Sequence, residues 1–297
     1  MSKIFKHIQS FLKTLITTFK NWNANEPFQM SAAVSYYALF SFPALLIIII
    51  QTTGIFYEKQ QIKNKIIKEI SEVLGRDAAS TIESMLQNAI DIEQTSLVII
   101  IGIITLLYGA TGMFIALQKS LNTIWKVKPK PKNELLKMIK DRIFSLGLIL
   151  VIGFLLLTSL VLTALITATT DWIGEHFPNF IIYVIQFINF ILSFILTTVL
   201  FALIFKVLPD VKIQWKDVWL GAFITTLLFS IGKYALGIYF GTVNPQSAFG
   251  AAGSVILILL WVSYSSLILF FGAEFTKVLS SRYGAGIEPA SYAERIS

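Results

Sequence analysis

The sequence predicts an all-α membrane protein, a polytopic bundle of six transmembrane helices, and three observations predict this fold. Six apolar stretches each reach or exceed the roughly 20 residues that a helix needs to cross about 30 Å of hydrocarbon. Basic residues fall almost entirely into alternate gaps between these stretches. Hydrophobic residues make up 55% of the 297 residues and charged residues 14%, which leaves no room for a separate soluble domain. The six stretches are residues 31–53, 96–117, 143–169, 180–205, 218–240 and 249–275.

Residues 1–27 precede the first stretch and predict a cytoplasmic amphipathic helix. Their apolar residues recur on one stripe of a helix, while the lysines lie off that stripe. This pattern is typical of a helix that lies in the membrane interface against anionic headgroups, and a helix packed under the bundle is the alternative. The stripe consists of Ile4, Ile8, Phe11, Leu12, Leu15, Ile16, Phe19 and Trp22.

The first gap is long and predicts an external hairpin of two helices at about residues 56–93. Apolar residues recur there at helical spacing and stop at Gly75, and Asp77 can cap a second helix. Acidic residues offset the basic ones in this gap, so its orientation signal is weak. The hairpin either rests on the bundle or covers its mouth as a lid.

The basic residues orient the bundle, because Lys and Arg in short loops remain on the cytoplasmic side. The N-terminal segment, the gaps after the second and fourth stretches, and the tail together hold 18 of the 24 basic residues. Both termini are therefore predicted to be cytoplasmic, with a transmembrane domain at residues 28–280 and a tail at 281–297 in a multi-pass inner-membrane protein. The same rule explains the net charge of +7, so no nucleic-acid partner is expected.

No catalytic constellation can be assembled from the sequence. The chain has no cysteine, and its two histidines, His7 and His176, fall on opposite sides of the predicted membrane. They cannot share a metal or form a relay, and no phosphate-binding loop, paired-aspartate centre or serine–histidine arrangement is visible. We therefore expect no enzymatic activity, no bound metal and no cofactor.

Ionisable groups inside a membrane span are costly, which makes them the first candidates for a substrate path. Two occur here, Lys233 in the fifth stretch and Glu274 at the inner end of the sixth. Lys233 either meets a substrate or extends its ammonium group to the outer headgroups. Glu274 either takes part in transport or pairs with Lys277, three residues later on a helix, or with a loop lysine. The different depths of the two groups argue against a salt bridge between them.

Pro43 adds a second kind of candidate, because a proline inside the first stretch removes a backbone donor and should kink the helix. The carbonyl groups that it frees near Leu39 can meet Tyr36, Tyr37 or water. The segment after the fifth stretch, with Asn244 before a proline, is either a plain hairpin or a re-entrant element that lines a cavity. The substrate-path candidates are thus Lys233, Glu274, Tyr36, Tyr37, Pro43, Asn244 and Tyr264.

A run of lysines and prolines, KVKPKPK at residues 126–132, follows the second stretch. Its two prolines forbid a continuous helix. The run is either a solvated inside loop or a clamp for phosphate-bearing headgroups. The headgroup-binding candidates are Lys126, Lys128, Lys130 and Lys132.

Two pairs of glycines, Gly237 with Gly241 and Gly109 with Gly112, lie three or four residues apart. Small residues at this spacing predict places where two helices approach closely.

Residues 249–278 read FGAAGSVILILLWVSYSSLILFFGAEFTKV, and three further blocks follow the same order as in one known family. Residues 30–46 contain a tyrosine pair and Phe-Pro, residues 121–125 read LNTIW, and residues 208–222 begin with LPD. Together these blocks resemble the YihY/BrkB family of inner-membrane proteins over about residues 28–280. The resemblance implies six helices, a cytoplasmic-membrane location, a link to virulence and envelope traits, and an old ribonuclease label. It implies no catalytic residues.

The sequence leaves two main functions open. The first is a transporter or flippase for an amphipathic, anionic or lipid-like substrate, because no Asp or Glu lies deep in any span, where ion-coupled carriers usually place one. The second is a non-transporting protein that maintains or organises the envelope, and a ribonuclease is the third and least supported. Membrane lipids, including anionic headgroups, are the expected partners, and a homo-oligomer is left open. A lipid-open cavity that contains Lys233 would favour the first function, and a tightly packed bundle the second.

Overall fold

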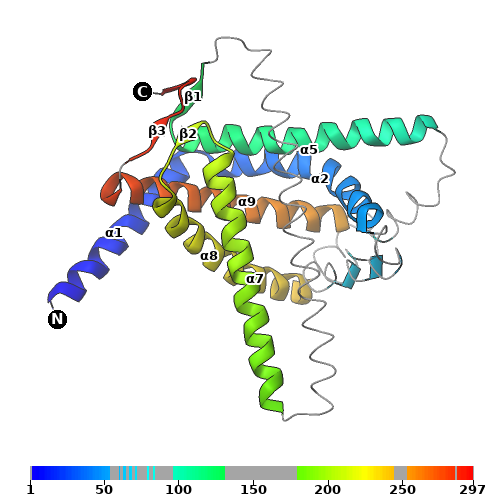
Figure 1. Cartoon of the computed structure of the whole chain (residues 1–297), viewed down its shortest axis with the longest axis horizontal. Helices are drawn as coiled ribbons and strands as arrows, with labels where there is room; N and C mark the ends of the chain where they lie inside the picture. Colours follow the sequence, from blue (N-terminus) through cyan, green and yellow to red (C-terminus); the bar gives the residue numbers. More distant parts are fainter. Residues whose placement is uncertain are drawn as a thin grey trace.

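The computed structural model describes residues 2–53, 96–130, 179–243, 253–284 and 286–296, with eight helical residues between 60 and 83. This part of the chain is mostly helical (Figure 1). Its helices are α1 (Ser2–Ala24), α2 (Pro27–Thr53), α5 (Ser96–Ile124), α7 (Asn179–Val207), α8 (Trp215–Val243) and α9 (Gly253–Tyr283). Its strands are β1 (Val127–Pro129), β2 (Val211–Lys212), β3 (Glu288–Pro289) and β4 (Ala293–Arg295).

Five of the six predicted stretches coincide with long helices, namely α2, α5, α7, α8 and α9. The predicted stretch at 143–169 lies outside the described residues. Within the described residues, three helices contain a stretch that is long and apolar enough to cross a membrane, at Phe187–Val207, Trp215–Tyr239 and Val255–Tyr283. Several helices extend past the predicted stretch. For example, α5 continues to Ile124, and Ser120, Leu121, Asn122 and Ile124 in its last turns are buried in the protein.

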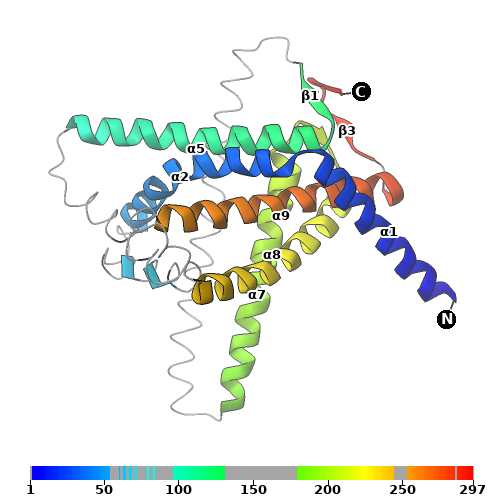
Figure 2. The same ribbon diagram turned by 180° about the vertical axis from the view of Figure 1, so that it is seen from behind.

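The helices pack as a chain of neighbours. Helix α2 packs against α5 and α9, α9 packs against α8, and α8 packs against α7. Figure 1 shows α2, α5 and α9 running alongside one another, while α7 is steeply inclined to them. Figure 2, from behind, shows α1 leaving the end of α2 obliquely and crossing α9, against which it packs. Helix α2 changes direction in its second half in both views. Pro43 belongs to this half of the helix and lacks the N–H that a straight helix needs.

The main core lies at the end of the molecule where α5 and α7 end, α8 begins and all four strands are found; we call this the strand end. Large apolar side chains fill it, and Leu121, Ile124, Phe205, Val218 and Phe270 are fully buried there. The indole N–H of Trp125 donates to the carbonyl oxygen of Ala273 over 3.0 Å, which joins the end of α5 to α9.

The strands correct the all-α prediction in detail. Strand β1 pairs antiparallel with β4, with Val127 opposite Arg295, and β2 pairs antiparallel with β3, with Val211 opposite Pro289. Residues 286–296 of the predicted tail therefore bind two separate loops, one after α5 and one between α7 and α8. The strands pair because backbone groups outside helices need hydrogen-bond partners. The sequence did not predict these pairs, because the paired strands are more than 70 residues apart along the chain and a local pattern cannot indicate them.

Close packing of α8 on α9 depends on glycines that meet threonines. A β-carbon added at Gly221 would overlap Thr276, and one added at Gly272 would overlap Thr225. The prediction for Gly109 is confirmed, because a β-carbon there would lie 2.9 Å from the backbone nitrogen of Ser41 in α2. At Gly237 the described residues show no such approach: none of their atoms lies within 4 Å of a β-carbon added there, and α8 borders the groove described below at this point.

Most of the predicted external hairpin at residues 56–93 lies outside the described residues. Its described residues are helical, and the ammonium group of Lys63 lies 3.1 Å from a carboxylate oxygen of Glu83. This ion pair joins the two halves of the segment. Whether the segment acts as a lid stays a prediction.

Candidate functional site

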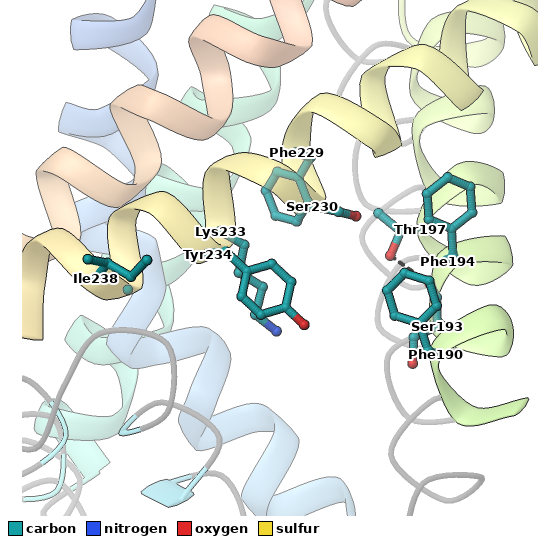
Figure 3. Close-up of a pocket in the computed structure, with 10 residues that line it drawn as sticks. Phe190, Ser193, Phe194, Thr197, Phe229, Ser230, Lys233, Tyr234 and Ile238 are labelled. Atoms are coloured by element: carbon teal, nitrogen blue, oxygen red, sulfur yellow. Dashed lines mark hydrogen bonds between the residues drawn. The ribbon is translucent and has the colours of Figure 1, made fainter. Parts of the chain in front are cut away.

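A groove of about 540 Å³ lies between α7 and α8 (Figure 3). On the side of the strand end, Thr198 donates to Thr226 over 3.1 Å and the rings of Phe201 and Phe229 lie 5.7 Å apart, so the two helices are in contact there. The groove follows where the helices separate. It is lined by Phe190, Ser193, Phe194 and Thr197 of α7 and by Phe229, Ser230, Lys233, Tyr234, Gly237 and Ile238 of α8.

The groove is open to the surroundings of the protein. Phe190, Tyr234 and Ile238 are exposed, and so is the side chain of Lys233. Both walls belong to helical stretches that are apolar and long enough to cross a membrane. The groove therefore lies between two helices that are each apolar and long enough to span a bilayer.

Lys233 is the cationic group of the groove. It lies six residues before Tyr239, where the apolar stretch ends, and ten before Val243, where α8 ends; at 1.5 Å per residue these are about 9 and 15 Å. In Figure 3 its ammonium group and the hydroxyl of Tyr234 extend from α8 toward the same side. Among the described residues, no carboxylate forms an ion pair with Lys233. The described residues therefore leave the positive charge of Lys233 uncompensated, so it can attract an anion that enters the groove.

Hydroxyl groups supply the other polar atoms. Ser193 and Thr197 lie one turn apart on α7, and Ser230 faces them from α8 (Figure 3). The hydroxyl of Thr197 donates to the carbonyl of Ser193 over 2.8 Å, so its lone pairs remain available in the groove. None of these three residues was among the sequence-based candidates, and Gly237 was expected only at a helix contact. Their spacing was the available signal, because Ser230, Lys233 and Gly237 recur on one face of a helix.

The structure does not bring the other substrate-path candidates to this groove. Tyr36 and Tyr37 of α2 form an aromatic pair, with ring centroids 5.4 Å apart, and Tyr37 also contacts the ring of Tyr108 in α5. Tyr264 of α9 lies on the opposite side of α8, where a β-carbon added at Gly232 would overlap its hydroxyl. Nothing is described for the Pro43 side chain, and Asn244 lies outside the described residues.

Glu274 occupies a second polar site, far from Lys233 along the helices. Its carboxylate is fully buried and accepts hydrogen bonds from Asn21 over 3.0 Å and from Asn25 over 3.2 Å. The ion pair with Lys277 expected from the sequence is present at 3.2 Å, and Lys277 also donates to the carbonyl of Ile124 over 2.7 Å. The Glu274 network thus ties α1, α5 and α9 together. Its donors satisfy the carboxylate, which favours a structural role.

The lysine run after α5 forms a ribbon instead of a continuous basic loop. Lys126 donates to the side chain of Asn25 over 3.1 Å, and Lys130 forms an ion pair with Glu294 of β4 at 2.7 Å. The hydrogen bond and the negative charge of Glu294 raise the pKa of Lys130. Lys128 is exposed, while Lys132 lies outside the described residues. A headgroup role for this run stays a prediction.

A buried carboxylate that the sequence analysis had not selected joins the loops of the strand end. Asp210 accepts hydrogen bonds from Asn122 over 2.8 Å and from Gln118 over 3.4 Å, and its backbone N–H donates to Asn122. Its carbonyl accepts from the N–H of Ala290. Asp210 belongs to the block LPD and Asn122 to the block LNTIW, so these two sequence blocks contact each other and hold the strand end together.

The model of the family described as virulence factor BrkB matches residues 18–297. The chain belongs to the BrkB virulence factor family. The match covers both helices that form the groove and every residue of the Glu274 network, but only the last turns of α1. The chain is a membrane protein of this family.

Curated relatives have the same general description. The chain is 29% identical over 182 residues to a UPF0761 membrane protein of Tolumonas auensis, covering 60% of this chain and 57% of the relative. It is 26% identical over 182 residues to a UPF0761 membrane protein of Verminephrobacter eiseniae, covering 61% of this chain and 41% of the relative. It is 20% identical over 257 residues to a UPF0761 membrane protein of Xanthomonas campestris, covering 86% of this chain and 57% of the relative. The chain thus spans about half the length of these relatives. No solved structure matches it.

Proposed function

We propose that this protein is a transporter or flippase for an amphipathic, anionic, lipid-like substrate. The observation that supports this function best is the position of Lys233, an exposed ammonium group within an apolar groove that opens sideways between α7 and α8. A charge in a membrane span costs free energy, so a cation that faces a groove is a candidate for an anionic ligand.

The shape and lining of the groove agree with this substrate class. Its volume of about 540 Å³ falls within the range of about 300–1,000 Å³ that is usual for small-molecule sites. Because the groove opens sideways, it can hold a headgroup while acyl chains remain in the bilayer. Lys233 would bind the phosphate or carboxylate, the hydroxyls of Ser193 and Ser230 would hydrogen-bond other headgroup oxygens, and Phe190 and Phe229 would contact the apolar part.

The protein would act in the inner membrane, with both termini cytoplasmic. The distribution of lysine and arginine residues supports this orientation. The strand end, where the loops after α5 and α7 meet the tail, would then face the cytoplasm, and the open part of the groove would lie toward the outer half of the membrane. Neither enzymatic activity nor a cofactor is part of this proposal.

Liposomes provide a direct test. The purified protein is reconstituted with a trace of nitrobenzoxadiazole-labelled phosphatidylglycerol or phosphatidylcholine, and dithionite bleaches only the label in the outer leaflet. Wild-type protein should increase the bleached fraction of the anionic probe more than that of the zwitterionic probe. Lys233→Met should slow movement of the anionic probe by about tenfold or more, because a hydrogen bond to a charged group contributes roughly 1.5–3 kcal/mol. Lys233→Arg should retain much of the rate.

Two further variants separate the groove from charge in general. Gly237→Leu adds a side chain into open space in the groove and should slow both probes while leaving Lys233 in place. Lys216→Met removes an exposed lysine from the first turn of the same helix and should have no effect. Wild-type rates in both Lys233→Met and Gly237→Leu would exclude the groove as the path. If wild-type protein moves neither probe, the non-transporting envelope function becomes the better hypothesis.

A further inference from the structure

Helix α1 binds the rest of the protein through its polar face. The guanidinium group of Arg282 donates to the hydroxyls of Thr14 over 3.0 Å and Thr17 over 2.9 Å, and Asn21 donates to Glu274. Ser10 also forms a hydrogen bond with the hydroxyl of Tyr283. These residues recur at intervals of three and four, so they occupy one face of the helix, and that face lies on α9.

The opposite face of α1 is apolar and uncovered. Leu12 is 51% exposed, and Ile16 and Phe19 are each 57% exposed. At about 100° per residue, these three side chains lie on the side of the helix that faces away from α9. The edge between the two faces packs on α9 through aromatic contacts, with the rings of Trp22 and Phe271 6.1 Å apart. This arrangement is the reverse of a helix on a soluble protein, which buries its apolar face.

We propose that the apolar face of α1 binds the surface of an anionic lipid bilayer. The position of the helix supports this occupant, because α1 leads into α2, a 27-residue apolar helix, through a turn at Asn25 and Glu26. Exposed Lys13 and Lys20 lie along the free edge of the apolar face, where they can meet anionic headgroups while the face enters the acyl region.

The apolar face of α1 is separate from the groove between α7 and α8. The orientation of α1 is fixed by its hydrogen bonds to the rest of the protein. An isolated amphipathic helix can leave a membrane and return to it. Here the hydrogen bonds to Glu274, Arg282 and Tyr283 hold the polar face, so only the apolar face remains for lipid. Contact with the bilayer would therefore position the strand end relative to the membrane plane.

The absence of cysteine from the chain makes a site-specific test simple. Single cysteines at Ile16 and Phe19 are labelled with nitrobenzoxadiazole in full-length protein, which is placed in nanodiscs of phosphatidylglycerol and phosphatidylcholine. Quenching by nitroxide-bearing lipid is compared with quenching by aqueous iodide. A label at Ile231, an exposed residue in the apolar stretch of α8, is the lipid reference, and a label at Glu294, on exposed β4, is the aqueous reference.

The labels at Ile16 and Phe19 should be quenched by nitroxide lipid nearly as well as the Ile231 label and poorly by iodide. Quenching like that of the Glu294 label would place the face in water, and protection from both quenchers would show that protein covers it, for example a second copy of the chain. Either result would overturn the proposal. Replacing Lys13 and Lys20 with Glu should reduce lipid quenching at Ile16, whereas the same change at Lys212 and Lys216 should not. An unchanged Lys13/Lys20 variant would refute the preference for anionic lipid.

Discussion

At the residue scale, Glu274 and Lys233 show how differently two charges in an apolar sequence can be accommodated. Glu274 is fully buried, and hydrogen bonds from Asn21 and Asn25 and an ion pair with Lys277 compensate its charge. Lys233 is exposed in a groove, and the described residues provide no carboxylate for it. A buried and compensated carboxylate such as Glu274 is typical of a structural role, whereas an uncompensated cation in an apolar stretch, such as Lys233, is a candidate for binding an anion.

Removing the carboxylate of Glu274 should destabilise the protein more than removing an exposed one. Glu274→Leu removes the carboxylate from the Lys277 ammonium group, which keeps only the Ile124 carbonyl, and leaves the amide groups of Asn21 and Asn25 without this acceptor, so we expect a loss of about 2–3 kcal/mol in the free energy of unfolding. Thermal unfolding of the purified protein in detergent measures this change. Glu294→Gln, which removes an exposed carboxylate, is the control and should unfold close to wild type. Equal melting temperatures for Glu274→Leu and wild type would refute the structural role.

The Glu274–Lys277 pair was one of the alternatives that the sequence left open, because both residues lie on one helix, three positions apart. The sequence could not predict the bonds from Asn21 and Asn25, which come from a helix about 250 residues earlier. The same limit applies to the groove. Lys233 was visible as a charge in an apolar stretch, but Ser193 and Thr197 became candidates only when the fold placed α7 beside α8.

At the element scale, the contact between α8 and α9 depends on the absence of side chains at two glycines. Gly272→Val should overlap Thr225 and force the helices apart, at a cost of about 1–3 kcal/mol. Gly237→Ala is a matched control on α8, because its new methyl group would meet no atom of the described residues within 4 Å. The control should be neutral or slightly stabilising, since Ala favours a helix more than Gly. Unfolding in detergent separates the two, and an unchanged Gly272→Val variant would show that the helices are not closely packed.

The ribbon of β1 and β4 should lose its ion pair only in alkaline solution. Glu294 raises the pKa of Lys130 above its usual 10.5, so the contribution of the pair to stability is complete below 10.5 and disappears as the pH rises through the raised value. Any difference in melting temperature between wild type and Glu294→Gln should therefore be present near neutral pH and absent once the pH exceeds the raised pKa of Lys130. The difference should be small and decrease with salt, because both side chains are exposed. A difference that persists at high pH would show that the ammonium group is not responsible.

At the scale of the whole molecule, local patterns predicted the helices well and their partners poorly. Five apolar stretches and residues 2–24 were expected to be helical and are helical, because hydrophobicity and length act within a segment. The paired strands were not expected, since β1 and β4 are separated by more than 160 residues. The amphipathic pattern of α1 was recognised, but only the structure shows that its polar face is the one bound to α9.

Purified protein should show no cleavage of RNA. The two histidines are separated along the chain at positions 7 and 176. Among the described residues, the buried carboxylates are Asp210, Asp217 and Glu274, and each accepts hydrogen bonds from other side chains. A fluorescent RNA substrate measures the activity, and the protein must be free of host nucleases. Activity that a single substitution in this chain abolishes would contradict this prediction.

The orientation of the whole molecule can be tested with single cysteines, and the fold strengthens the prediction. The turn after α1, the loop after α5, the loop before α8 and the tail all meet at the strand end, through bonds such as Lys126 to Asn25 and the β2–β3 pairing. We therefore expect these segments to lie on the same side of the membrane, and their lysines and arginines predict that this side is the cytoplasm. Cysteines at Ser2, Asn133, Asn179 and Gln246 should react with a membrane-impermeant maleimide in intact cells only at Asn179 and Gln246. Permeabilised cells provide the control, in which all four should react. Labelling at Asn133 in intact cells would overturn the six-span topology, and with it the proposed position of the groove toward the outer half of the membrane.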